Sequence, residues 1–157
     1  MPEHRMTTVG EILSFMLAGN ATLTLQSQRT GKHYTYKVKL AKNRQEGAAN
    51  APLRWFVNLL SGPDNTTDYT YIGLMEQRQE QENRLSFRLT RASQLGPKAG
   101  PVAGFSWFTR KVVAEDEKAL TEKVHVFHEG RCGKCNRKLT DPTSIRLGIG
   151  PVCRGDQ

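Results

Sequence analysis

Three cysteines near the carboxyl-terminal end are the residues best suited to chemistry. Cys132 and Cys135 are separated by two residues, and Cys153 follows after a polar stretch; the 157-residue sequence holds no other cysteine. A C-x-x-C turn presents two thiolates from one tight loop, and zinc prefers four sulfur or nitrogen ligands in a tetrahedron. The spacing therefore predicts that the turn supplies two ligands of one Zn²⁺ and that Cys153 supplies a third.

The fourth ligand is predicted to be a histidine. His128 lies four residues before the first cysteine, at the end of a strand predicted over Val124–His128. We favour it over His125, which points to the opposite face of that strand; Asp141 and a water molecule are more distant alternatives. A Cys3His set made only of protein groups leaves no open coordination position, which predicts one structural zinc ion.

The sequence gives less support to two other uses of the thiols. A redox C-x-x-C pair stands between a strand and a helix in a thioredoxin-like pattern, and a disulfide with one free thiol suits a secreted chain. The sequence shows neither that pattern nor a signal peptide. Gly133 and Asn136 also favour a metal knuckle: the first leaves room for backbone amides to turn toward sulfur, and the second tolerates a left-handed backbone.

The remaining elements follow from hydrophobic periodicity. A helix is predicted from Val9 to Leu17, with Thr8 and Glu11 as a capping box, and a second begins at Pro101–Val102. Alternation at period two predicts strands over residues 21–28, 33–40, 53–60, 67–74 and 84–89. The expected fold is α+β. A mainly antiparallel sheet of about five strands with two helices occupies residues 1–123, opening on a loose leader over residues 1–7. A small zinc ribbon or knuckle occupies residues 124–157.

The basic charge indicates a polyanionic partner. The net charge is +8 and the isoelectric point about 9.7, which is typical of proteins that bind nucleic acid. Candidate phosphate-binding residues fall on the predicted hairpin and on the metal module: Arg29, Lys32, Lys37, Lys39, Lys134, Arg137, Lys138 and Arg146. Two plainer interpretations stay open. The hairpin cations would also discourage sheet aggregation, and the module cations would offset the charge of the thiolates.

The aromatic residues and the missing motifs narrow the function further. Trp55, Phe56, Tyr69 and Tyr71 are expected mainly in the core, although they could also stack on bases. The sequence contains no Walker loop, no H-E-x-x-H, no zinc-deaminase signature and no nucleophile elbow, so we expect no enzyme. No apolar run is long enough for a membrane span, which predicts a cytoplasmic protein without a membrane partner.

The stretch from His128 to Cys153 resembles a family of uncharacterised domains common in bacteriophage genomes and in phage-like regions of bacteria. Its members carry the signature C-G-x-C-G-R-x-L-T-x-P-x-S-I…G-[IL]-G-P-x-C. Here Asn136 stands where the family usually has glycine, and Lys138 occupies a variable step. The resemblance covers about 26 of the 157 residues. It implies a zinc-binding phage accessory protein and carries no assigned activity.

These features together predict a non-enzymatic, zinc-binding accessory protein that holds the phosphate backbone of DNA or RNA inside the host cytoplasm. The alternative is a protein-interaction module that inhibits a host enzyme or defence complex. In that case the zinc is purely structural and the basic surface meets an acidic host protein.

Overall fold

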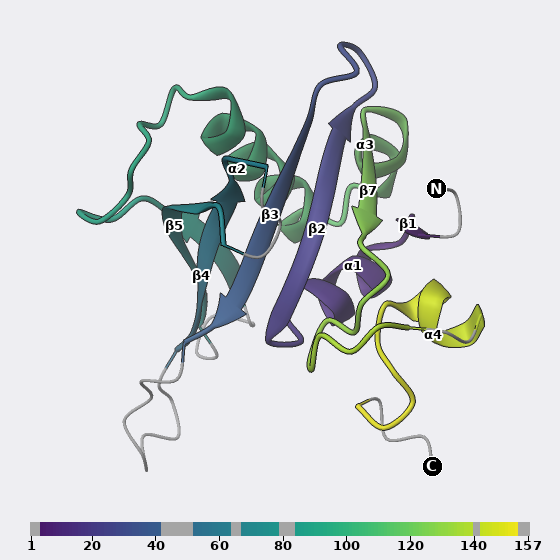
Figure 1. Ribbon diagram of the computed structural model, residues 1–157. Coiled ribbons are helices and arrows are strands. Elements are labelled where there is room, and N and C mark those ends of the chain that lie inside the picture. Colours follow the sequence, from purple (N-terminus) through teal and green to yellow (C-terminus); the bar gives the residue numbers. More distant parts are fainter. Residues whose placement is uncertain (1–3, 42–51, 64–66, 79–83, 140–141, 154–157) are drawn as a thin grey trace.

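The computed structural model describes residues 4–41, 52–63, 67–78, 84–139 and 142–153 (Figure 1). Within these ranges, seven strands form one antiparallel sheet in the order β1-β7-β2-β3-β4-β5-β6. This confirms the α+β class with an antiparallel sheet. The strands are β1 (Arg5–Met6), β2 (Asn20–Ser27), β3 (His33–Leu40), β4 (Leu53–Leu60), β5 (Tyr69–Arg78), β6 (Arg84–Arg88) and β7 (Val124–His128).

Three helices pack against one face of the sheet. Helix α1 (Val9–Met16) begins at the predicted capping box, in which the Thr8 hydroxyl accepts from the amide of Glu11. Helix α2 (Gly100–Val113) has proline in its first turn, as predicted, and the chain then breaks at Glu115, which has a φ of 55°. Helix α3 (Glu117–Glu122) follows, capped by the Asp116 side chain. None of the described helices combines the length and apolar character of a membrane span.

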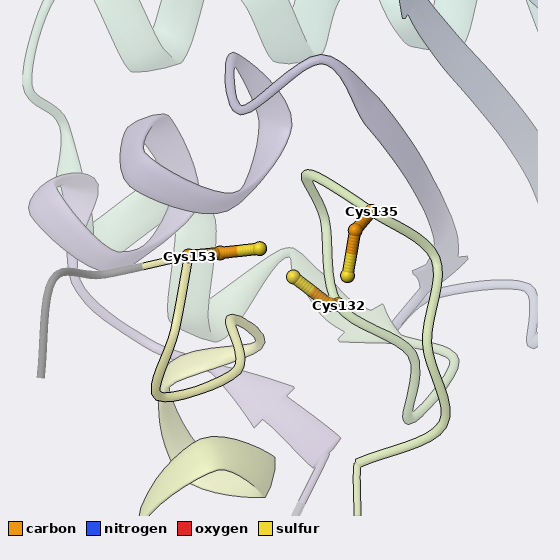
Figure 2. A group of neighbouring side chains, drawn as sticks. All are labelled: Cys132, Cys135 and Cys153. Carbon is orange, nitrogen blue, oxygen red and sulfur yellow. The ribbon is translucent and has the colours of Figure 1, made fainter. Parts of the chain in front are cut away.

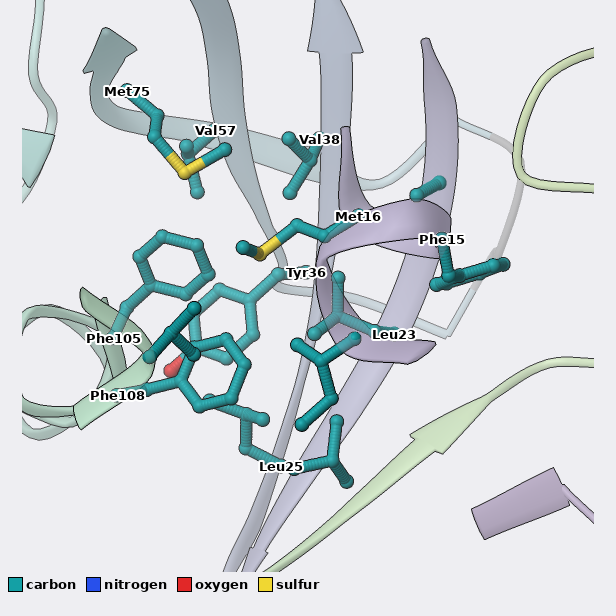
Figure 3. Packing of buried hydrophobic residues seen from close by; sticks show 14 of the residues in the cluster. Phe15, Met16, Leu23, Leu25, Tyr36, Val38, Val57, Met75, Phe105 and Phe108 are labelled. Atoms are coloured by element: carbon teal, nitrogen blue, oxygen red, sulfur yellow. The ribbon is translucent and has the colours of Figure 1, made fainter. Parts of the chain in front are cut away.

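The core lies between these helices and the strands (Figure 3). The aromatic rings of Phe105 and Phe108 from α2 meet Tyr36 of β3, and Met16 of α1 packs nearby. Alternate strand residues fill the same layer, among them Leu23, Leu25, Val38 and Val57, all at most 7% exposed. The other sheet face carries the alternate positions, so β3 has one apolar face and one cationic face.

Two short segments that were expected to lack regular structure form elements of the fold. Residues 5 and 6 were expected in a loose leader, but they form β1, which pairs with β7 and buries Met6 to 1% exposure. Residues 142–147 were expected in a polar loop, but they form helix α4 (Pro142–Leu147). Both are too short to show a period, which explains why the sequence did not reveal them.

Strand β7 joins the sheet to the metal module. Residues 124–128, which were predicted to open the carboxyl-terminal module, form β7, and this strand lies inside the sheet between β1 and β2. The cysteine-containing part therefore begins after His128. From here on, "metal module" means residues 129–153.

Candidate metal centre

The three cysteines meet at one point, as the sequence predicted (Figure 2). Their sulfur atoms all lie within 4.8 Å of one another. Four sulfurs held at about 2.3 Å from a tetrahedral zinc ion lie about 3.8 Å apart, so the observed separation suits one metal ion. Cys132 is buried, Cys153 is half-buried and Cys135 is exposed.

The turn around the first two cysteines has the backbone of a metal knuckle. The amide of Asn136 donates to the carbonyl of Cys132 at 2.9 Å, and Asn136 adopts a φ of 66°, the left-handed conformation predicted for it. The amide of Lys134 points at the Cys132 sulfur, 3.4 Å away. A short bridge between Arg131 and Lys138 closes the loop behind the turn. The turn thus supplies amide hydrogens where a thiolate needs them.

The surroundings of the thiols favour one ionised sulfur. Burial alone would raise the pKa of Cys132, but hydrogen bonds from the amides of Gly150, Cys135 and Lys134, together with one from the Cys153 thiol, lower it to about 7. Burial and hydrogen bonds with the other two sulfurs raise the pKa of Cys153 to about 11. Three thiols this close cannot all ionise unless a cation is present, because neighbouring negative charges repel. A divalent metal ion would provide that charge.

The module is docked on Phe15 at the end of α1. A Cβ atom added to Gly133 would lie 2.8 Å from the Phe15 ring, and one added to Gly148 would lie 2.6 Å from it. Gly148 also has a φ of 73°, which side chains rarely adopt. The amide of Asn20 at the start of β2 donates to the carbonyl of Gly133 at 2.7 Å. The two glycines therefore allow the module to lie flat against the helix, and no local pattern identified Phe15 as their partner.

His128, the predicted fourth ligand, stands apart from the sulfur cluster. It is not among the described residues whose ligand atoms gather there. Its Nδ1 accepts from the amide of Gly130 at 3.0 Å, and its Nε2 is bonded to the carbonyl oxygen of Ile145. Both ring nitrogens are therefore occupied by backbone groups, and Nε2 carries the proton.

His128 instead connects the sheet to the module. Its ring is 2% exposed and contacts Phe15, with ring centroids 5.5 Å apart, while His4 stacks on it at 4.9 Å. Burial lowers the pKa of His128, the charge of His4 adds to this effect and the bond to Ile145 opposes it. His125 lies on the opposite face of β7, beside Phe127. The remaining candidate, Asp141, lies outside the described residues.

The eight predicted phosphate-binding cations do not form one group. Arg29 and Lys32 lie at the turn between β2 and β3, whereas the module lies at the other end of these strands (Figure 1). The module carries four that are all exposed: Lys134, Arg137, Lys138 and Arg146. The last two, Lys37 and Lys39, lie on the helix-free face of β3, and Lys39 pairs with Asn20, the residue bonded to the module. Four of the eight thus belong to the module, and Lys39 lies on the part of β3 next to it.

The predicted core aromatics divide between the two faces of the sheet. Trp55 is 2% exposed and belongs to the core, as expected. Phe56 is 44% exposed on the helix-free face and meets Tyr71 edge-on, with ring centroids 6.1 Å apart. The Lys37 ammonium lies 5.5 Å from the centroid of the Tyr69 ring. The core expectation was therefore wrong for Phe56, whose position opposite Trp55 along β4 follows from strand alternation.

Comparison with known proteins finds a match for the carboxyl-terminal part of the chain only. Residues 123–157 match a family of unknown function, DUF6011. The match includes all three clustered cysteines and begins just before β7. No curated protein and no solved structure matches the chain.

Proposed function

We propose that Cys132, Cys135 and Cys153 hold one structural Zn²⁺ and that the surface beside this ion binds the phosphate backbone of a nucleic acid without catalysis. Thiolates are soft ligands that select zinc over magnesium or calcium. Bound there, the ion neutralises the thiolates and fixes a module whose own core is small. The fourth position falls to a group outside the described residues or to water, since both nitrogens of His128 are engaged.

The observation that carries the proposal is the concentration of cations where the module meets the sheet. Lys134, Arg137 and Lys138 are exposed on the knuckle. Lys37 lies close enough to the module for its charge, with that of Arg131, to oppose the rise that burial gives the pKa of Glu129. Glu129 itself faces Arg131 at 4.0 Å. A polyanion that reached this edge would meet module and sheet cations together.

The helix-free face supports the same partner. Exposed Phe56 and half-buried Tyr71 and Tyr69 lie beside the β3 lysines on strands β4 and β5. The buried Glu76 on this face is held by Arg54 and Arg78, each at 2.8 Å, so its charge is compensated. Aromatic rings beside a cationic track are the usual means by which proteins hold nucleic acid without reading its sequence.

We propose no catalytic role. A zinc ion that neutralises three thiolates and fixes the module serves as a scaffold, and the sequence carries none of the catalytic motifs named above. The cytoplasmic location and the accessory role in a phage-infected host rest on the sequence and on the family resemblance alone. They stay predictions.

Binding to labelled oligonucleotides over a range of salt concentrations tests the proposal. We expect log affinity to fall linearly with log salt, with a slope of about −0.7 to −0.9 for each phosphate contact. The triple variant Lys134→Gln/Arg137→Gln/Lys138→Gln should lower the steepness of that slope by about 2 to 3. Metal analysis of the same samples should find one zinc per chain.

A matched control separates a binding surface from net charge. Lys98→Gln/Arg110→Gln/Lys118→Gln removes the same charge from exposed residues in or next to the helix layer. It should leave the slope unchanged; an equal loss in both variants would refute a localised surface. A salt-independent interaction, or a stoichiometric protein partner recovered from nuclease-treated host lysate without any nucleic-acid binding, would instead support the interaction-module alternative.

A further inference from the structure

A cavity of about 840 Å³ lies at the other end of β2 and β3, away from the metal module. It is open to solvent on one side and is lined by the β2–β3 turn, the first half of α2 and the junction of α3 with β7. The amide of Gln28 in the turn donates to the carbonyl of Lys123 at that junction, 3.1 Å away. This bond fixes two sides of the opening. Its volume is in the range of small-molecule sites.

The walls of the cavity are mostly apolar and aromatic. Leu25 and Val124 come from the sheet, and Tyr34, Tyr36 and Trp107 add three rings. The Tyr36 hydroxyl donates to the carbonyl of Pro101 at 2.7 Å, which fixes that ring. Trp107 is half-buried, and the Lys111 ammonium lies 6.0 Å from its ring centroid. Such walls suit a flat aromatic ring.

The rim of the cavity is cationic. Arg29, Lys32 and Lys123 are exposed and line the opening, with Glu122 as the one acid among the lining residues. Ammonium and guanidinium groups are the usual partners of a phosphate, and a doubly charged group complements three cations better than a carboxylate does. The charge of the rim and the aromatic walls of the cavity therefore suit a ligand that joins an aromatic ring to a phosphate group.

Gly104 gives an independent sign that the space is used. It lies inside α2 and lines the cavity. Glycine within a helix is unfavourable relative to alanine. A Cβ atom added there would meet nothing closer than the Tyr36 hydroxyl at 3.8 Å, an ordinary contact. Packing therefore does not require glycine at this position, and a larger side chain would project into the cavity.

We propose that this cavity binds a nucleoside phosphate, with the base against Trp107 and Tyr34 and the phosphate at Arg29, Lys32 and Lys123. The site goes beyond the proposed nucleic-acid surface and does not depend on it, because the two lie at opposite ends of β2 and β3. The cations at the β2–β3 turn thus serve a small ligand, and those near the module serve a polymer.

Calorimetric titration of the full chain with AMP, GMP, CMP and UMP tests this site. We expect at least one of them to bind with one site per chain. Its nucleoside should bind at least tenfold more weakly, because it lacks the phosphate group that the rim cations would bind. Arg29→Gln/Lys123→Gln should cause a similar loss. Binding should also change the tryptophan fluorescence, since Trp107 lines the cavity while the other tryptophan, Trp55, is buried in the core.

Two substitutions at Gly104 keep the test independent of folding. Gly104→Ala should raise the Tm by about 2–4 °C through helix propensity, and Gly104→Leu should keep a cooperative unfolding transition yet abolish nucleotide binding. Oligonucleotide binding should survive in Gly104→Leu, and the module triple variant should still bind the nucleotide. No binding of any nucleotide at millimolar concentration, equal binding of the nucleoside, or unchanged binding in Gly104→Leu would overturn the proposal.

Discussion

The sheet and the metal module are stabilised in different ways. One continuous cluster of buried residues joins the strands to α1, α2 and α3. In the described part of the module, by contrast, the only hydrophobic residues that are buried are Cys132 and Leu139. A segment with so little apolar burial cannot offset the entropy of ordering its backbone. We therefore expect the sheet to fold by hydrophobic burial and the module to depend on a metal ion bound by its cysteines.

The two regions nevertheless share a boundary. Phe15 belongs to the hydrophobic cluster and also lies against Gly133 and Gly148 of the module. His128 ends β7 and bonds to Gly130 and Ile145 beyond it. The sheet therefore provides a preformed surface on which the module closes, which reduces the entropy that metal binding must offset.

Removal of the metal gives the strongest test of this comparison. Chelation, or the substitution Cys132→Ser, should abolish hydrogen-exchange protection of amides in the module, such as those of Cys132, Asn136 and Gly148, because apparent binding energies of structural zinc reach about 10–16 kcal/mol. Amides in β2–β5 should stay protected. Hydrogen exchange with mass spectrometry resolves the two regions.

Adding zinc back to the chelated wild type serves as the control and should restore protection in the module. Cys132→Ser should not recover to the same degree. Loss of protection across the whole sheet would show that the two regions are one cooperative unit. Full protection of the metal-free module would show that its order does not depend on metal binding by the cysteines.

Phe15→Ala should weaken both regions. Deletion of a buried phenylalanine side chain costs about 3–5 kcal/mol of unfolding free energy, and here it also removes the surface beneath Gly133 and Gly148. Metal affinity, measured by competition with a chromophoric chelator, should fall as well. Phe105→Ala is the control, because Phe105 is equally buried but contacts Tyr36, Phe87 and Phe108 in the sheet core. Equal metal affinity in the two variants would contradict the role of Phe15.

The features that the sequence predicted correctly are mostly those set by neighbours in the chain. Strands β3, β4 and β7 begin and end where alternation predicted them. The capping box at Thr8 likewise fixed the start of α1. These signals are local, because a strand face or a helix cap is defined by neighbours in the chain. The clustering of Cys132, Cys135 and Cys153 was also predictable, since metal chemistry fixes which residue types must meet.

The sequence did not predict the contacts between residues that lie far apart in the chain. No residue pattern near Gly133 or Gly148 predicts that both glycines contact the ring of Phe15, more than a hundred residues earlier in the chain. The environment of His128 depends on Gly130 and on the carbonyl of Ile145 in α4, a helix too short to show a period. Spacing alone therefore suggested a ligand where the structure places a connecting residue.

His128→Ala separates these two roles. As a connecting residue, His128 contributes two hydrogen bonds and two ring contacts, so its loss should lower stability by about 1–3 kcal/mol with one metal ion still bound per chain. The electronic spectrum of the Co²⁺ form, which reports thiolate ligation, should keep its shape. His125→Ala, on the opposite face of β7, should change stability by less than about 0.5 kcal/mol. A loss of bound metal in His128→Ala comparable to that of Cys132→Ser would restore His128 as a ligand.

The smallest expected effect lies in the sheet and depends on pH. Glu76 is almost fully buried and accepts hydrogen bonds from Arg54 and Arg78, both at 2.8 Å. These bonds lower the pKa of Glu76 below its ordinary value of 4.5, although burial acts in the opposite direction. Because both arginines are about half exposed, Glu76→Gln should cost only about 1 kcal/mol at pH 7.

The sign of the pH dependence makes this test specific. The folded protein holds Glu76 ionised to a lower pH than the unfolded chain does, so its contribution is present above pH 4.5 and is lost as the pH falls through the lowered pKa. Urea unfolding of wild type and Glu76→Gln should therefore differ at pH 7 and converge in acid, whereas exposed Glu122→Gln should match wild type throughout. A difference that persisted in acid would show that Glu76 acts through packing rather than charge. Because Glu76 lies in β5, outside the module, the same convergence should occur with and without metal.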